Sequence, residues 1–182
     1  MRNEKDINQE YHRELRDVRN LRKEIRANET GEYGNEARKN DLLRDLDRKW
    51  TSRVDEYRME AMEARQEAVK QAKKRAFRLT GVDARNALQM ANSIDKDSLE
   101  KEYRKADERS DNTLKHAIAY RGFNEGRGDL VDKWADETPT NRQEIDDLRE
   151  ASQRASDTTS LQNEYTSYGP VKSGGDEEWL DA

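Results

Sequence analysis

The stretch that decides the fold is residues 35–79, with the sequence NEARKNDLLRDLDRKWTSRVDEYRMEAMEARQEAVKQAKKRAFRL. Apolar or small residues recur along it at a mean spacing of about 3.6, the period of a straight α-helix. Neither proline nor glycine interrupts it, so the spacing predicts one very long helix over residues 35–79. The second half of the stripe is mainly alanine, which lets a partner helix approach closely. The expected helix-packing positions are Leu43, Leu46, Trp50, Tyr57, Ala61, Ala64, Ala68 and Ala72.

The length of this helix conflicts with a compact fold. At about 1.5 Å per residue, it would span roughly 65–70 Å. A compact domain of this chain's size would be only about 40 Å across. Either the molecule is a rod, or other chains bury the exposed length. We therefore expect a helical assembly protein.

The composition agrees with helices that depend on partners. Charged residues make up 41% of the chain and hydrophobic residues 31%, with a net charge of -5. Ordinary globular proteins have about 25% and 45–50%, so a large private core is not expected. The absence of cysteine excludes disulfides, zinc thiolate sites and thiol nucleophiles. No stretch approaches the roughly 18 apolar residues of a membrane span, so we expect a soluble protein made in a cytoplasm.

The remaining sequence predicts an all-α fold. A narrow apolar stripe over residues 4–28 resembles a coiled-coil seam and would form a helical hairpin with the long helix. We expect a second long helix over 98–125, a kink near Gly126–Gly128 and short C-terminal helices. Periodicity fails after Ser156, which predicts an extended C-terminal arm. The expected domains are a long hairpin (1–80), a helical bundle (81–156) and the arm (157–182).

One dense basic cluster lies near the end of the long helix. Phosphate contacts from such a cluster would give salt-dependent nucleic-acid binding. However, several of its members share one face at i,i+4 spacing near a helix C-terminus, where cations are favoured anyway. We favour a solvated helix face over a nucleic-acid site. The candidate phosphate contacts are Lys70, Lys73, Lys74, Arg75 and Arg78.

No pattern in the sequence points to catalysis. His12 and His116 are the only histidines and have no metal-binding context, so no metal and no cofactor are expected. The glycines at 122–128 lack the spacing of a phosphate loop and are interpreted as a structural kink. No carboxylate pair is singled out by an apolar setting. We expect that the protein is not an enzyme.

The C-terminal segment combines a glycine pair, an acidic run and a large apolar anchor, in the order Gly174-Gly175-Asp176-Glu177-Glu178-Trp179-Leu180-Asp181-Ala182. Such a segment suits docking, with the aromatic ring in a pocket and the acids on a basic rim. The alternative is a solubilising acidic tail, which would not need the Trp-Leu pair. The expected partner-docking residues are Trp179, Leu180, Tyr165 and Tyr168.

The segment HAIAYRGFNEG (116–126), followed by LVDKW (130–134) and IDDL (145–148), resembles helical structural proteins of tailed bacteriophages, those of the head and head–tail connector. The resemblance covers about 40 residues, and the long N-terminal hairpin departs from the compact bundle of connector adaptors. It implies a ring of copies between portal and tail, each reaching a neighbour through its C-terminal arm. No functional residue is carried over position by position.

These observations together favour a noncatalytic virion protein, an oligomeric component of the head–tail connector. Its expected partners are further copies of itself and other virion proteins such as the portal. The alternatives are a capsid assembly scaffold, a helical nucleic-acid-binding protein using Lys70–Arg78, and a cytoplasmic coiled-coil adaptor of a host cell.

Overall fold

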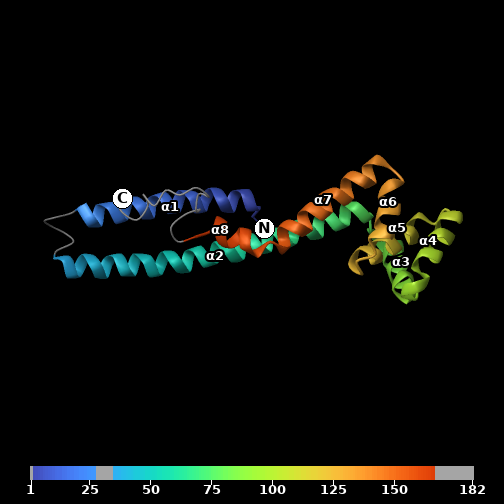
Figure 1. The fold of residues 1–182 in the computed structure, drawn as a ribbon, viewed down its shortest axis with the longest axis horizontal. Coiled ribbons are helices and arrows are strands. Elements are labelled where there is room, and N and C mark those ends of the chain that lie inside the picture. The colour runs from blue at the N-terminus through green and yellow to red at the C-terminus, as the bar shows by residue number, and fades with distance from the viewer. Residues whose placement is uncertain (1, 28–34, 167–182) are drawn as a thin grey trace. The chain divides into compact units, whose positions relative to one another are not determined.

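The computed structural model of the protein describes residues 2–27 and 35–166. Within these ranges the chain is helical and has no strand, which confirms the predicted all-α class (Figure 1). The helices are α1 (Glu4–Ala27), α2 (Glu36–Phe77), α3 (Gly81–Ser93), a 3-10 turn (Lys96–Ser98), α4 (Leu99–Glu108), α5 (Asn112–Asn124), α6 (Gly128–Asp136), α7 (Pro139–Ser156) and α8 (Thr158–Glu164).

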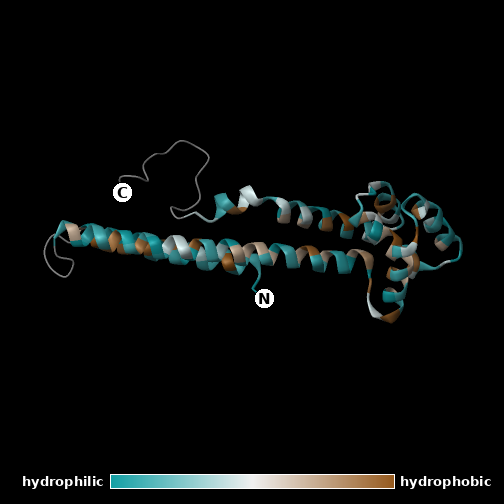
Figure 2. Cartoon of the chain, turned by 90° about the horizontal axis from the view of Figure 1, so that it is seen from below, coloured by the Kyte–Doolittle hydropathy of each residue, from teal (hydrophilic) through white to brown (hydrophobic). Residues whose placement is uncertain are grey.

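The predicted long helix is confirmed as α2, a single helix of 42 residues. Asn35 caps its N-terminus, because its side-chain oxygen accepts a hydrogen bond from the backbone N–H of Arg38 at 3.1 Å. The helix ends at Phe77, since Arg78 has a left-handed backbone with φ of 47°. Figure 2 shows hydrophilic residues over most of α1 and α2, with hydrophobic ones recurring at intervals.

The chain divides into two compact units, and α2 contributes to both. Unit 1 consists of the chain up to Arg65 together with the part from Ser156 onward, and unit 2 is Gln66–Ala155. This division differs from the predicted domains 1–80, 81–156 and 157–182. The predicted boundary at residue 80 followed the end of the long helix, whereas the two cores meet different halves of that helix.

Unit 1 is a hairpin of α1 and the first part of α2, joined by α8. Ion pairs from α1 and the residues just before it to α2 run in opposite order along the two segments, as an antiparallel pair requires: Arg2 pairs with Glu60, and Arg22 with Asp47. Aromatic and aliphatic side chains of all three helices fill the core. Its buried members are Ile7, Tyr11, Leu15, Trp50, Val54, Tyr57, Ala61, Ala64, Leu161 and Tyr165.

Residues 158–164 form α8 where the sequence predicted the start of an extended arm. Asp157 caps this helix by accepting a hydrogen bond from the N–H of Ser160 at 2.9 Å. Leu161 and Tyr165, one turn apart, reach the core of unit 1. The short arm segment from 158 to 164 is therefore helical because it has a cap and an apolar face of its own.

Unit 2 packs the second part of α2 with α3 to α7. Its core mixes alanines with a few large side chains, including Phe77, Leu99, Ile118, Trp134 and Leu148. The indole nitrogen of Trp134 donates to the backbone oxygen of Ala76 at 3.3 Å, so this ring is fixed against α2.

The predicted helix over 98–125 is divided into α4 and α5. Ser110 takes a left-handed conformation with φ of 56°, and the N–H of Asp111 returns to the carbonyl of Ala106 at 2.8 Å. This is a Schellman-type helix end. Asp111 then caps α5 by accepting from the N–H of Leu114 at 3.0 Å.

The predicted kink at the glycines is confirmed between α5 and α6. Gly126 has φ of 73°, a conformation that glycine adopts without strain. The N–H of Arg127 donates to the carbonyl of Gly122 at 2.8 Å and closes the end of α5. An added Cβ at Gly122 would lie 3.2 Å from the Cβ of Leu130, so glycine also allows α5 and α6 to approach each other closely.

The predicted helix-packing positions divide into three groups. Trp50, Tyr57, Ala61, Ala64 and Ala72 are buried, and Leu43 and Leu46 are half-buried. Ala68, predicted to pack, is exposed. Along α2 the buried residues of unit 1 end at Arg65 and those of unit 2 begin at Ala72. Ala68 lies between them, so it keeps the helical spacing of the stripe but packs in neither core.

Candidate functional site

The basic residues between positions 70 and 78 do not share one environment within unit 2. Lys70, Lys73 and Lys74 line one cavity, of about 440 Å³. Arg75 instead lines a smaller cavity of about 230 Å³, beside the acidic residues Glu144 and Asp147 of α7. The five predicted phosphate contacts therefore do not form one continuous cationic surface.

The larger cavity has apolar walls under its lysines. Side chains of α2, α3, α5 and the α2–α3 connection contribute to it, and its volume is within the range of about 300–1,000 Å³ typical of ligand pockets. Its non-lysine lining is Gln66, Val69, Leu79, Leu88 and Tyr120. The cavity can accept a group that is apolar at one end and negatively charged at the other.

The three lysines of this cavity differ in how they are held. The Nζ of Lys73 donates to Oδ1 of Asn124 at 2.9 Å and lies 5.3 Å from the ring centroid of Phe123. Lys70 pairs with Glu67 at 3.3 Å, and its side chain is 64% exposed. Lys74 is exposed. Lys73 is thus a fixed charge, whereas Lys70 and Lys74 can reorient toward a ligand.

The lysines of this face affect the carboxylate of Glu67. The pKa of Glu67 is lowered from its ordinary value by hydrogen bonds from Gln71 and Lys70, with a further electrostatic contribution from Lys74. Glu67 therefore stays ionised and offsets part of the lysine charge.

Arg78 contacts polar side chains of α7. Its Nη2 donates to Oδ1 of Asn141 at 3.4 Å and lies 3.9 Å from Oε2 of Glu144. This arrangement fits a structural role for Arg78 and removes it from the lysine-lined cavity.

A buried charged cluster in unit 2 was not predicted. The side chain of Lys115 is only 7% exposed and lies between Asp107 at 2.7 Å and Glu137 at 2.9 Å. The hydroxyl of Tyr103 donates to Glu137 at 2.6 Å. These residues come from α4, α5 and the end of α6, so no spacing in the sequence brings them together.

The chemistry of this cluster is that of a structural ion pair. Burial alone would lower the pKa of Lys115, but its bonds to Asp107 and Glu137 outweigh burial and raise it. Burial and the bond to Glu137 likewise raise the pKa of Tyr103. Lys115 thus stays protonated and Tyr103 neutral, so neither is prepared to act as a base or nucleophile at neutral pH.

Each of the two histidines lies beside an aromatic side chain. His116 is half-buried edge-on to Trp134, with ring centroids 4.3 Å apart. Burial is the main cause that lowers its pKa, followed by the nearby charge of Arg78. His12 is exposed beside Tyr11. Within the described ranges, no group of three or more His, Asp or Glu side chains could hold a metal ion.

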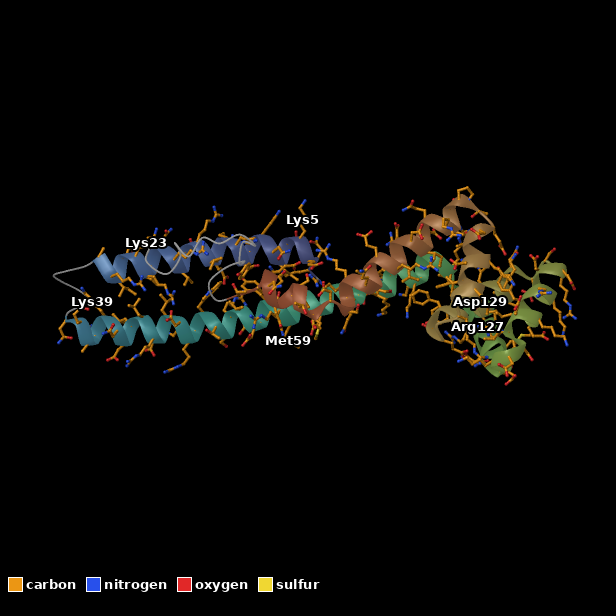
Figure 3. The ribbon with its side chains drawn as sticks, viewed as in Figure 1. Lys5, Lys23, Lys39, Met59, Arg127 and Asp129 are labelled. Carbon is orange, nitrogen blue, oxygen red and sulfur yellow. The ribbon has the colours of Figure 1, made fainter. Side chains whose placement is uncertain are left out.

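The glycine-rich segment at 122–128 contains one cationic side chain, Arg127, which is already paired with a carboxylate. The guanidinium of Arg127 binds both carboxylate oxygens of Asp129, at 3.0 and 2.8 Å, and both residues are labelled in Figure 3. A further bond to the carbonyl of Lys96 at 3.3 Å fixes Arg127 to the start of the 3-10 turn. The segment joins elements of unit 2.

The end of the described chain is fastened to unit 1. The hydroxyl of Tyr11 donates to the carbonyl of Thr166 at 2.8 Å, and the N–H of Thr166 lies 3.1 Å from the same hydroxyl. Nε of Arg58 donates to the carbonyl of Tyr165 at 2.8 Å. The backbone at 165–166 is therefore held by side chains of both α1 and α2.

Tyr165, predicted to dock on a partner, is instead part of its own chain's core. It is fully buried, with its ring 5.1 Å from that of Tyr11 and 6.5 Å from that of Tyr57. A large aromatic ring one turn after Leu161 gains more from an available apolar pocket than from solvent. The other predicted docking residues, Tyr168, Trp179 and Leu180, lie outside the described residues.

Arg65 is a second buried cation that sequence reasoning missed. Its side chain is 2% exposed and pairs with Glu4 of α1 at 2.6 Å and Glu164 of α8 at 2.8 Å. It also donates to the carbonyl of Asp157 at 3.3 Å. Arg65 thereby joins the three helices of unit 1, and the only sequence signal was an arginine next to the predicted core position Ala64.

Comparison with known proteins gives no relative: no family model, no curated protein and no solved structure matches the chain. Among the helices of residues 2–27 and 35–166, none is both long and apolar enough to cross a membrane.

Proposed function

We propose that the protein is a noncatalytic structural protein of a bacteriophage virion, an oligomeric component of the head–tail connector. In this proposal the segment after Thr166 docks on neighbouring subunits. Its partners are further copies of the chain and other virion proteins such as the portal. The resemblance of 116–126, 130–134 and 145–148 to phage head and connector proteins supports the choice of virion.

One observation carries the assembly part of the proposal. The chain is fixed at Tyr165–Thr166 by Tyr11 and Arg58, and an acidic segment with a Trp-Leu pair follows in the sequence. A fixed point of departure lets a docking segment act at a defined place on each subunit, which reduces the entropy that binding must overcome.

A noncatalytic role is supported by how buried polar groups are used. Lys115 and Arg65, the most buried charged side chains with two carboxylate partners each, hold helices together in their own unit. His116 packs on Trp134. Each of these groups has a structural task where it lies.

Electron microscopy of the purified full-length chain tests the proposal. We expect closed particles of uniform diameter, either from the chain alone or after addition of the portal. Single small particles under both conditions would overturn it. Copy number separates a permanent component from an assembly scaffold, since a scaffold leaves and would be depleted from mature virions.

A nucleic-acid function using Lys70–Arg78 has less support, because Arg75 and Arg78 border Glu144 and Asp147. A DNA titration at low salt decides it, since phosphate binding would be strong there and would weaken steeply with salt.

A further inference from the structure

The lysine-lined cavity of unit 2 has a specific chemical asymmetry. Four apolar or aromatic side chains form its walls, and three ammonium groups belong to one side of it, all from a single stretch of α2. Val69 and Leu88 are only half-buried although they pack on the core of unit 2. The cavity therefore offers apolar surface that the described chain leaves partly uncovered.

Lysines at 70, 73 and 74 provide a cationic border of defined length. Positions 70 and 74 are one helical turn apart on the same face, and 73 lies beside them. Their ammonium groups thus face an area that a few consecutive acidic residues of a peptide would cover. A solvated border of this kind attracts and orients an acidic partner.

The protein's own sequence contains a segment of the matching chemistry. Residues 176–180 have three acidic side chains in succession, Asp176, Glu177 and Glu178, directly before Trp179 and Leu180. Three carboxylates correspond to three lysines, and an indole with a leucine corresponds to the apolar walls. Trp buries a large area and is enriched among the residues that dominate binding energy.

We infer that this cavity is the docking site for residues 176–180 of a neighbouring copy of the chain. The inference rests on the proposed assembly function and specifies the surface that the C-terminal segment would meet. Trp179 and Leu180 enter between Val69, Leu88 and Tyr120, and the acidic run lies along Lys70 and Lys74. Lys73, held by Asn124, sets the fixed charge between them.

A peptide titration tests the site. A fluorescent peptide of residues 173–182 is added to the full-length chain carrying Trp179→Ala and Leu180→Ala, whose own segment no longer competes. We expect saturable binding that weakens with salt, because exposed ion pairs are screened. Replacing Trp in the peptide by Ala should weaken binding roughly 30-fold, the effect of losing a hot-spot residue.

Charge variants locate the binding. Lys70→Gln with Lys74→Gln should weaken peptide binding roughly tenfold, because two ion pairs are lost. The matched control is Lys5→Gln with Lys23→Gln, which removes the same charge from exposed positions on α1 (Figure 3) and should leave binding unchanged. Equal effects of the two double variants, or no binding of the peptide, would overturn the inference.

Zero-length crosslinking tests whether the segment comes from a neighbour. A carbodiimide joins lysine amines to carboxylates in contact, and a mixture of isotopically light and heavy chains distinguishes the copies. We expect light–heavy crosslinks between Lys70 or Lys74 and residues 176–178. Crosslinks confined to single copies would overturn docking between copies. Closed particles by electron microscopy without these crosslinks would reject this site and keep the proposed function.

Discussion

The two units use one helix to build different cores. The first part of α2 gives unit 1 the rings of Trp50 and Tyr57, which pack with Tyr11 and Tyr165. The second part gives unit 2 mainly alanines, and its large side chains come chiefly from other helices. The period of the pattern is the same in both halves. The size of the residues on the stripe, more than their spacing, distinguishes the two cores.

The polar groups show a second contrast. In unit 1 ion pairs join helices both at the surface, as Arg53 does with Glu14 at 3.2 Å, and in the interior, as the buried Arg65 does with Glu4 and Glu164. Arg53 also donates to the hydroxyl of Tyr57 at 3.1 Å. In unit 2 the cluster around Lys115 lies among shorter helices. Unit 1 therefore depends on cross-helix polar contacts to supplement a narrow core.

The largest expected effect is the loss of Tyr165. Tyr165→Ala should destabilise unit 1 by about 3–5 kcal/mol, because a fully buried aromatic side chain leaves a cavity between α1, α2 and α8. Amides of α1 should then exchange hydrogen faster, while those of α3 to α6 keep their rates. The exposed Met59→Ala is the control and should change neither unit by more than about 0.5 kcal/mol. Equal acceleration in both units would contradict the division into two cores.

A smaller loss is expected from the cation that joins the helices of unit 1. Arg65→Ala should cost about 2 kcal/mol, because it removes charge-assisted hydrogen bonds to Glu4 and Glu164 in a buried setting. Arg44→Ala removes an arginine that is 79% exposed and pairs with Asp41 only at 3.8 Å, so it should cost less than about 0.5 kcal/mol. Urea unfolding followed by circular dichroism measures both. Similar losses of unfolding free energy in the two variants would show that the burial of Arg65 does not add to stability.

Unit 2 should respond to acid through Glu100. The ion pairs of Glu100 with Lys133 and Arg104 lower its pKa from 4.5 to about 2. A lowered pKa stabilises the fold above the unfolded value, and this contribution is lost as pH falls from 4.5 toward 2. Glu100→Gln should therefore lose less stability than the original chain across that window. Parallel curves of unfolding midpoint against pH for the two proteins would refute this assignment.

The smallest expected effect is a gain at the α4–α5 break. Ser110→Gly should stabilise unit 2 by about 1 kcal/mol, because Ser110 has a left-handed backbone that costs a side-chain-bearing residue about that much. Ser98, at φ of -94°, is the matched control, and Ser98→Gly should give no gain. The thermal midpoints of the two variants measure the difference, and a loss at Ser110 would mean that its side chain has a task in the turn.

Local signals in the sequence predicted α2 and the break at Gly126. The 3.6-residue period and the glycines are both properties of neighbouring residues. Two other helix boundaries were not predicted. The Ser110-Asp111 turn lies within a stripe that keeps its period, and the cap at Asp157 precedes only one short helix. These helix boundaries depend on hydrogen bonds, which the spacing of apolar residues does not predict.

The remaining features depend on tertiary packing. Lys115 meets Asp107 and Glu137 only because α4, α5 and α6 fold together, and Tyr165 meets Tyr11 across 154 positions of sequence. The basic cluster looked uniform in the sequence, but α7 brings Glu144 and Asp147 to one side of it. Predicting the burial of these groups requires knowing which helices are neighbours. The residue spacing within a single helix does not give that information.

The most direct test of assembly through the C-terminal segment is the molar mass of the full-length chain in solution, measured by light scattering beside its Trp179→Ala, Leu180→Ala variant. We expect a multimer of fixed mass for the original chain and a monomer, with unchanged helical content, for the variant. A monomer in both cases at every concentration, with and without the portal, or the same multimer in both, would contradict assembly through this segment.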